Sequence, residues 1–95
     1  MGAVIGYLEI EVSIPHARSL KEKRSFVKKL VERLRNNFNA SVSEVGKHDS
    51  WRSAVIGIAV VGNNSQVIDS YLEKIIDYAE KLYPGSICYH HKEIF

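Results

Sequence analysis

The chain of 95 residues contains little cysteine, little proline and no long apolar run. Its one cysteine, Cys88, excludes an internal disulfide and a zinc site built from paired thiolates, so we expect a reducing, cytoplasmic location and a small buried side chain. The longest apolar run, residues 54–61, is far shorter than the roughly 20 residues that span a bilayer. The first residues carry no basic stretch ahead of an apolar one, so no secretory signal and no membrane partner are expected.

The sequence patterns that mark enzymes are absent as well. The chain has no glycine-rich phosphate loop and no dinucleotide-binding fingerprint. It also has no nucleophilic residue at a characteristic spacing from a residue that could act as its general base. His90 and His91 are adjacent on an expected strand, so they would point to opposite faces and could not bind one metal ion together. The spacing of the other histidine and acidic residues matches no known zinc-binding pattern. We therefore expect a protein that is not an enzyme and holds no metal or cofactor. A hydrolase that uses His48 and Asp49 is one alternative.

The charge distribution is more informative than the net charge of +2. Residues 19–38 contain seven basic and two acidic residues, a net charge of +5, so the remainder of the chain carries −3. Such a separation of charge can steer a polyanionic partner. The remaining composition, with 45% hydrophobic and 25% charged residues, is typical of one globular domain over residues 1–95.

Hydrophobic periodicity predicts four strands and two helices. The expected strands cover residues 4–14, 40–47, 51–62 and 86–95. The second is expected to be irregular, because Val42 and Val45 would point to opposite faces of a regular strand. The first helix starts in a capping box formed by Ser19 and Glu22, and the second starts at Asn63 or Asn64. The order β-α-β-β-α-β predicts a ferredoxin-like α+β sandwich, with a four-stranded antiparallel sheet and both helices on one face. The expected core contains Val4, Leu8, Ile10, Leu30, Leu34, Ile56, Ile58, Leu72 and Ile76.

Two motifs carry a family resemblance. Residues 19–24 (SLKEKR) and residues 38–51 (FNASVSEVGKHDSW) resemble the YlxP-like family of small bacterial proteins, a family of unknown function. The resemblance covers nearly the whole chain and implies the same ferredoxin-like fold, but it implies no established activity. Genes of such proteins often lie beside those for translation initiation and ribosome maturation factors, which associates the family with RNA.

The predicted topology brings both motifs to the same end of the domain. A basic cluster at a helix start, with one tryptophan nearby, favours contact with RNA or a ribonucleoprotein. The candidate residues are His16, Arg18, Lys21, Lys23, Arg24, Lys28, Arg35, Lys47, His48 and Trp51. Lys21, Lys28 and Arg35 are spaced seven apart on one side of the helix, as expected for contacts to a phosphate backbone.

Each of these residues also has a structural interpretation. Ser19 and Glu22 are explained by capping, the cations by a solvated helix surface, and Trp51 by anchoring of a strand end. Acidic side chains in the second motif, Glu44 and Asp49, could pair with Arg18 or Arg24 and so join the two motifs.

The sheet face without helices predicts self-association. Its apolar residues, namely Ile5, Tyr7, Val55, Ala59 and Val61, form a patch that a homodimer would bury. Alternatively, Tyr7 covers Gly57 across the strands. An RNA-recognition motif is disfavoured on this face because the third strand has Ser53, Val55 and Gly57 where that motif has aromatic residues, and the first strand carries two glutamates. A homodimeric interaction module is therefore the second functional hypothesis.

Overall fold

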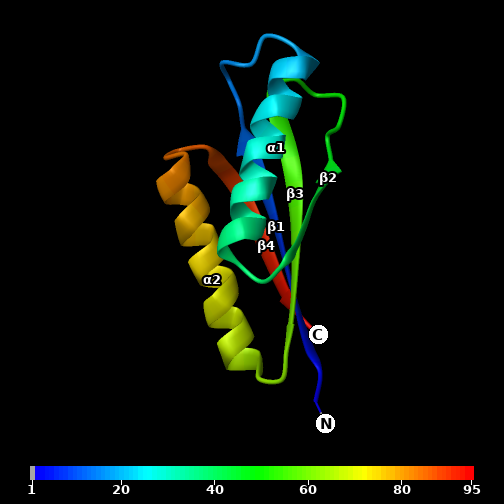
Figure 1. Cartoon of the computed structure of the whole chain (residues 1–95), viewed down its shortest axis with the longest axis vertical. Helices are drawn as coiled ribbons and strands as arrows, with labels where there is room; N and C mark the ends of the chain where they lie inside the picture. Colours follow the sequence, from blue (N-terminus) through cyan, green and yellow to red (C-terminus); the bar gives the residue numbers. More distant parts are fainter. Residues whose placement is uncertain (1) are drawn as a thin grey trace.

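The computed structural model describes residues 2–95 and has a four-stranded antiparallel sheet with two helices packed on one face (Figure 1). The elements in chain order are β1 (Val4–Ser13), α1 (Leu20–Asn37), β2 (Ser41–Gly46), β3 (Ser53–Gly62), α2 (Ser65–Leu82) and β4 (Ile87–Ile94). The strands are ordered β2-β3-β1-β4, so β1 and β3 are central. The predicted ferredoxin-like order and topology are confirmed. Neither helix is long and apolar enough to cross a membrane.

The irregularities in the sheet come from two bulges. In β2 the pairing shifts between Glu44 and Gly46, which confirms the predicted irregular strand. In the pairing of β1 with β4, Cys88 is the extra residue between Ile87 and Tyr89. The prediction that Cys88 is buried was wrong, because the bulge at this edge strand leaves its side chain exposed.

The helix starts follow from short polar side chains. Asn64 is the cap of α2, and its Oδ1 accepts hydrogen bonds of 3.0 Å from the amides of Gln66 and Val67. Ser19 caps α1 and accepts from the Glu22 amide at 3.1 Å. Glu22 in turn accepts from the Arg18 amide at 2.7 Å, one residue earlier than in the usual capping box.

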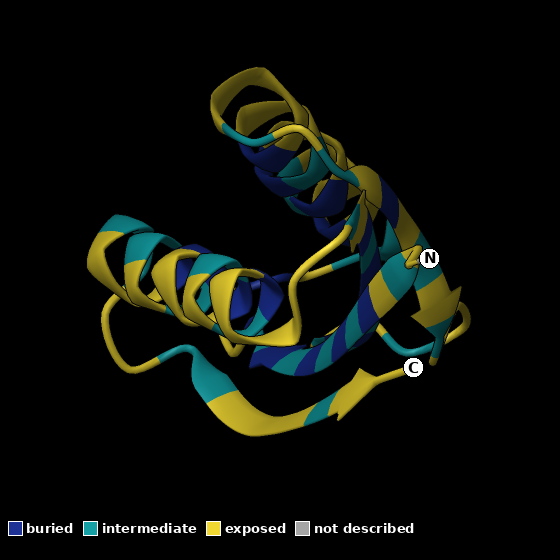
Figure 2. Cartoon of the chain, turned by 90° about the horizontal axis from the view of Figure 1, so that it is seen from below, coloured by how far each residue is buried: buried dark blue, intermediate teal, exposed yellow. Residues whose placement is uncertain are grey.

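The core lies between the sheet and the inner sides of the two helices (Figure 2). Seven of the nine predicted core residues are buried, whereas Val4 at a strand end and Ile76 on the flank of α2 are half-buried. Leu34 of α1 and Ile58 of β3 are each at most 1% exposed. The opposite face of the sheet has no helix over it, and we call it the open face.

Truncation of the core tests this assignment. Leu34→Ala or Ile58→Ala should lower the free energy of unfolding by about 2–5 kcal/mol, because each leaves a cavity between the layers. Val67→Ala is the control, since Val67 is 63% exposed and its loss should change stability by no more than about 0.5 kcal/mol. Urea denaturation measures the three values, and a core variant that matches the control would contradict the assigned packing.

Candidate functional site

The two sequence motifs meet at one end of the molecule. The loop of residues 14–19, the first turns of α1 and the turn of residues 46–52 lie together at the top of Figure 1, and we call this region the α1 pole. The backbone links the pole to the sheet: the Ile14 amide donates to the Arg52 carbonyl at 2.7 Å. The predicted convergence of the two motifs is therefore present.

Lys23 joins the two motifs from inside the protein. Its side chain is 0% exposed, although the sequence interpretation counted it among surface cations, so that assignment was wrong. Its ammonium lies 2.8 Å from the Glu44 carboxylate and donates to the carbonyls of Lys47 at 2.8 Å and His48 at 3.4 Å. Lys47 has a left-handed backbone with φ of 58°, which belongs to the turn that presents these carbonyls. Glu44 therefore pairs with a lysine, not with an arginine as expected.

A signal for this burial was present in the sequence. Leu20, Val27 and Leu30 define the apolar stripe of α1, and position 23 lies on that stripe by its spacing of three and four residues. A lysine on such a stripe needs partners inside the protein, because a buried charge without them is strongly unfavourable.

Three other predicted site residues are engaged by neighbouring groups. Arg35 donates to the Val42 carbonyl of β2 at 2.6 Å. The ammonium of Lys47 lies 2.6 Å from the Glu11 carboxylate on the open face. The His48 ring lies 3.2 Å from the carbonyl of Glu44. Arg35 and His48 thus contact carbonyls of the edge strand β2.

The remaining predicted cations are exposed. Arg18, Lys21, Arg24 and Lys28 form no ion pair and no side-chain hydrogen bond with residues 2–95. Lys21, Arg24 and Lys28 are three and four residues apart, so they follow one side of α1, and Arg35 continues that side toward β2.

The aromatic candidates also lie at the surface of the pole. Trp51 is 49% exposed and belongs to the turn, since β3 begins at Ser53 and not at residue 51 as predicted. His16 is exposed and contacts Phe26 edge-on, with ring centroids 6.4 Å apart. Asp49 is exposed beside His48. Within residues 2–95, no group of three or more His, Cys, Asp and Glu side chains is arranged to hold a metal ion.

The open face is apolar at one end and acidic in the middle. Ile5 pairs with Val61 across the strands and exchanges backbone hydrogen bonds with Phe95, so three apolar side chains form a row that is 46%, 73% and 69% exposed. Tyr7 covers Gly57, where an added Cβ would lie 2.9 Å from the tyrosine hydroxyl oxygen. This confirms the alternative interpretation of Tyr7 as a cover for the glycine. Val55 and Ala59 are half-buried.

Two side chains outside the pole have shifted pKa values. Burial raises the pKa of Tyr7 above its ordinary 10.0, and the carboxylate of Glu9, which accepts its hydroxyl at 2.9 Å, adds to this effect. Hydrogen bonds to Asp69 and Glu73 of α2 raise the pKa of Lys92. Lys92 thus forms ion pairs that connect β4 with α2.

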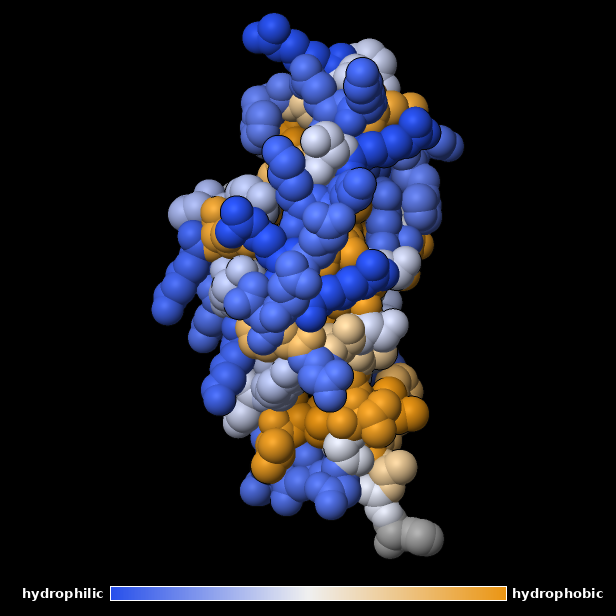
Figure 3. All heavy atoms as spheres, viewed as in Figure 1, coloured by the Kyte–Doolittle hydropathy of each residue, from blue (hydrophilic) through white to orange (hydrophobic). Residues whose placement is uncertain are grey.

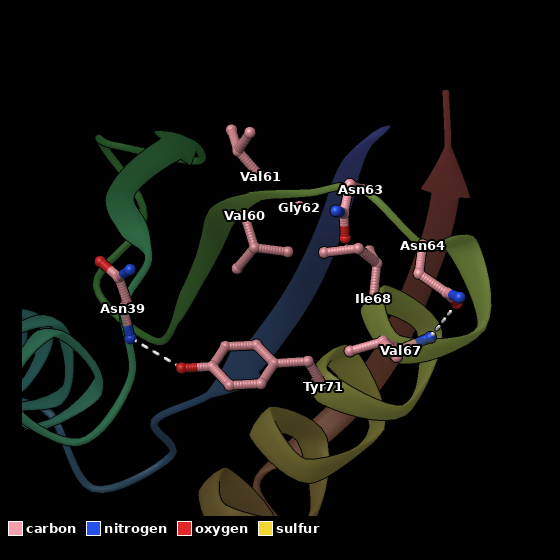
Figure 4. Close-up of a pocket in the computed structure, with 9 residues that line it drawn as sticks. All are labelled: Asn39, Val60, Val61, Gly62, Asn63, Asn64, Val67, Ile68 and Tyr71. Carbon is pink, nitrogen blue, oxygen red and sulfur yellow. Dashed lines mark hydrogen bonds between the residues drawn. The ribbon is translucent and has the colours of Figure 1, made fainter. Parts of the chain in front are cut away.

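Among the cavities on the surface of residues 2–95, two could accept a ligand. The first has a volume of about 220 Å³ and lies between the end of β3 and the start of α2, where Val60 and Ile68 form its wall and the Tyr71 hydroxyl accepts from the Asn39 amide at 2.8 Å (Figure 4). The second has a volume of about 360 Å³ and lies beside the α1 pole. It is lined by Ser13, Pro15, His16, Phe26, Leu82, Tyr83, Pro84, Gly85 and Ser86.

The buried ion pair can be tested by removing one charge or both. Lys23→Met leaves the Glu44 carboxylate, whose side chain is 17% exposed, without its cation, and should cost about 3 kcal/mol, near the lower end of the range for broken buried pairs. Adding Glu44→Leu should restore part of that stability, because no unpaired charge remains. Lys28→Met, on the exposed side of α1, is the control. Chemical denaturation measures all four proteins, and a double variant no more stable than Lys23→Met would contradict the ion pair.

Comparison with known proteins agrees with the fold and the motifs. Residues 5–91 match the family described as "Protein of unknown function (DUF503)". The chain is 36% identical over 77 residues to the uncharacterized protein YlxP of Bacillus subtilis (strain 168), which covers 81% of this chain and 84% of that protein. The de novo designed protein Foldit4 has a similar structure, with a TM-score of 0.54 and 16% identity over 98% of this chain and 96% of that one, which concerns the fold alone. The chain therefore belongs to the DUF503 family.

Proposed function

We propose that this protein is a non-enzymatic cytoplasmic binding protein that contacts RNA or a ribonucleoprotein through the α1 pole and one side of α1. The observation that carries the proposal is the row of Lys21, Arg24 and Lys28, which are exposed and lack internal partners. A cation already paired within the protein gains little from a phosphate, whereas an unpaired one releases counterions when it binds.

The shape of this row suits a phosphate backbone. Helix α1 is continuous over 18 residues, so Lys21 and Lys28 are separated by about 10 Å along its axis. The face that α1 presents is mostly hydrophilic, whereas hydrophobic atoms gather near the other end of the molecule (Figure 3). Lys23 holds the helix start against the neighbouring turn, which favours a fixed arrangement of the cations.

The rest of the surface favours a one-sided contact with a polyanion. Glu9, Glu11 and Glu93 lie on the open face, and Asp69 and Glu73 lie on α2. These carboxylates would repel phosphates, so a nucleic acid is expected to bind along α1 and away from the sheet.

Charge reversal on two matched helices tests the proposal. Lys21→Glu with Lys28→Glu should weaken binding to structured RNA of any sequence. The slope of log affinity against log salt concentration should become less steep by about 1.4–1.8 units, because two phosphate contacts are lost. The control, Lys74→Glu with Lys81→Glu on α2, has the same spacing and the same change in charge. Fluorescence anisotropy over a range of salt concentrations measures both. Equal losses in the two variants, or no binding by the unmodified protein at low salt, would refute the proposal.

A second candidate function is a homodimeric interaction module, and we propose the open face as its contact. The row of Ile5, Val61 and Phe95 supports this function. These side chains are neighbours on β1, on β3 and directly after β4, and exposed apolar side chains that lie together favour burial against a partner. A second copy can supply the same row through a two-fold axis.

The dimer hypothesis predicts the effect of a charge in this row. Val61→Lys should shift a dimer to monomer in sedimentation experiments without loss of stability, because Val61 is 73% exposed in the single chain. Ser70→Lys, an exposed position on α2, is the control. An unmodified protein that sediments as a monomer, or a dimer that survives Val61→Lys, would exclude this contact.

A further inference from the structure

We propose that the cavity beside the α1 pole binds an unpaired RNA base, so that the protein prefers single-stranded RNA to duplex RNA. The inference rests on the proposed function and specifies its ligand. The cavity, of about 360 Å³, lies between the loop before α1, the side of α1 and the loop between α2 and β4. Its volume is within the usual range of small-molecule sites.

The walls of this cavity are aromatic. Phe26 of α1 packs against Tyr83, with ring centroids 4.6 Å apart and planes inclined by 45°, and His16 contacts the edge of Phe26. Both Phe26 and Tyr83 are partly buried, pack against the core and also line the cavity. Stacking on such rings is how proteins bind bases of single strands, because every base has a flat π-face.

The polar groups at the cavity also suit a base. Within residues 2–95, the His16 ring and the Tyr83 hydroxyl have no hydrogen-bond partner, so both remain available for the polar edge of a base. An apolar side chain from a protein partner would cover these groups without satisfying them, at an energetic cost. This is why we assign the cavity to a base and not to a peptide.

Three hydrogen bonds fix the chain segments beside the cavity. The Ser13 amide donates to the Ser86 carbonyl at 2.7 Å, and the Ser86 hydroxyl donates to the Tyr83 carbonyl at 2.7 Å. The Gly85 amide donates to the Glu80 carboxylate at 2.9 Å. The first bond joins the end of β1 to the loop between α2 and β4, and the other two fix that loop against the end of α2, so little ordering is needed when a ligand enters.

The charge around the cavity favours a nucleotide. Lys29 lies one helical turn after Phe26, and Arg18 follows His16 by two residues. The neighbouring carboxylates of Glu22 and Glu80 already accept backbone amides. A strand that crosses the start of α1 could therefore place a base in the cavity and its neighbouring phosphates on Arg18 and Lys29, which a paired helix cannot do without opening.

The test compares a short unstructured RNA with the duplex formed by that RNA and its complement, at fixed salt. The unmodified protein should bind the single strand more tightly. His16→Ala and Tyr83→Leu should weaken single-strand binding by about 5-fold to 150-fold, as expected for loss of a stacked base, and leave duplex binding unchanged. Tyr83→Phe, which keeps the ring but removes the hydroxyl, should weaken single-strand binding less than Tyr83→Leu, by about 2-fold to 12-fold for one lost hydrogen bond. His90→Ala, an exposed histidine outside the cavity, is the control and should leave the affinity unchanged.

The outcomes separate the two proposals. If the pocket variants bind single strands as the unmodified protein does, or lose duplex binding equally, the base site is wrong while the contact through α1 stands. If the unmodified protein binds neither RNA, both proposals fail. Circular dichroism verifies folding, and His16→Ala, on an exposed loop, decides the question if Tyr83→Leu does not fold.

Discussion

The geometry of the α1 pole depends on the buried ammonium of Lys23. This group needs several acceptors in one place, and it finds the Glu44 carboxylate and two carbonyls of the turn after β2. Since β2 is an edge strand, its only ladder partner is β3, and Lys23 supplies a second attachment from the helix layer. A buried ammonium is strongly unfavourable in any arrangement that lacks those acceptors. The need for them therefore favours one position of α1 relative to the turn.

The same attachment determines which charges of α1 reach the solvent. With Lys23 turned toward the sheet, Lys21, Arg24 and Lys28 follow the outer side of the helix. Seven of the eleven acidic side chains lie on α2 or on the open face, and two of those on α2, Asp69 and Glu73, bind Lys92. The basic and acidic surfaces are thus carried by different elements, which gives a polyanion one favoured direction of approach.

Local patterns predicted the secondary structure well where side-chain periodicity was regular. The alternation in β1 and β3 and the polar caps Ser19 and Asn64 correspond to the observed elements. The errors concern positions where pairing between distant strands decides the outcome. Cys88 is exposed because of a bulge against β1, and Trp51 belongs to a turn because pairing of β3 begins only at Ser53.

The sequence by itself determined the order of the elements, the helix caps, the apolar stripes and the concentration of positive charge in α1, because these depend on residues close together in the chain. The place of Lys23 on the apolar stripe indicated that it is buried, but only the tertiary structure decided its partners and those of Arg35. Both bind main-chain carbonyls of the β2 region, and every residue carries such a carbonyl, so the side-chain pattern does not predict which carbonyls accept. The aromatic cavity is likewise formed by His16, Phe26 and Tyr83 from separate segments, which become neighbours only when the helices pack on the sheet.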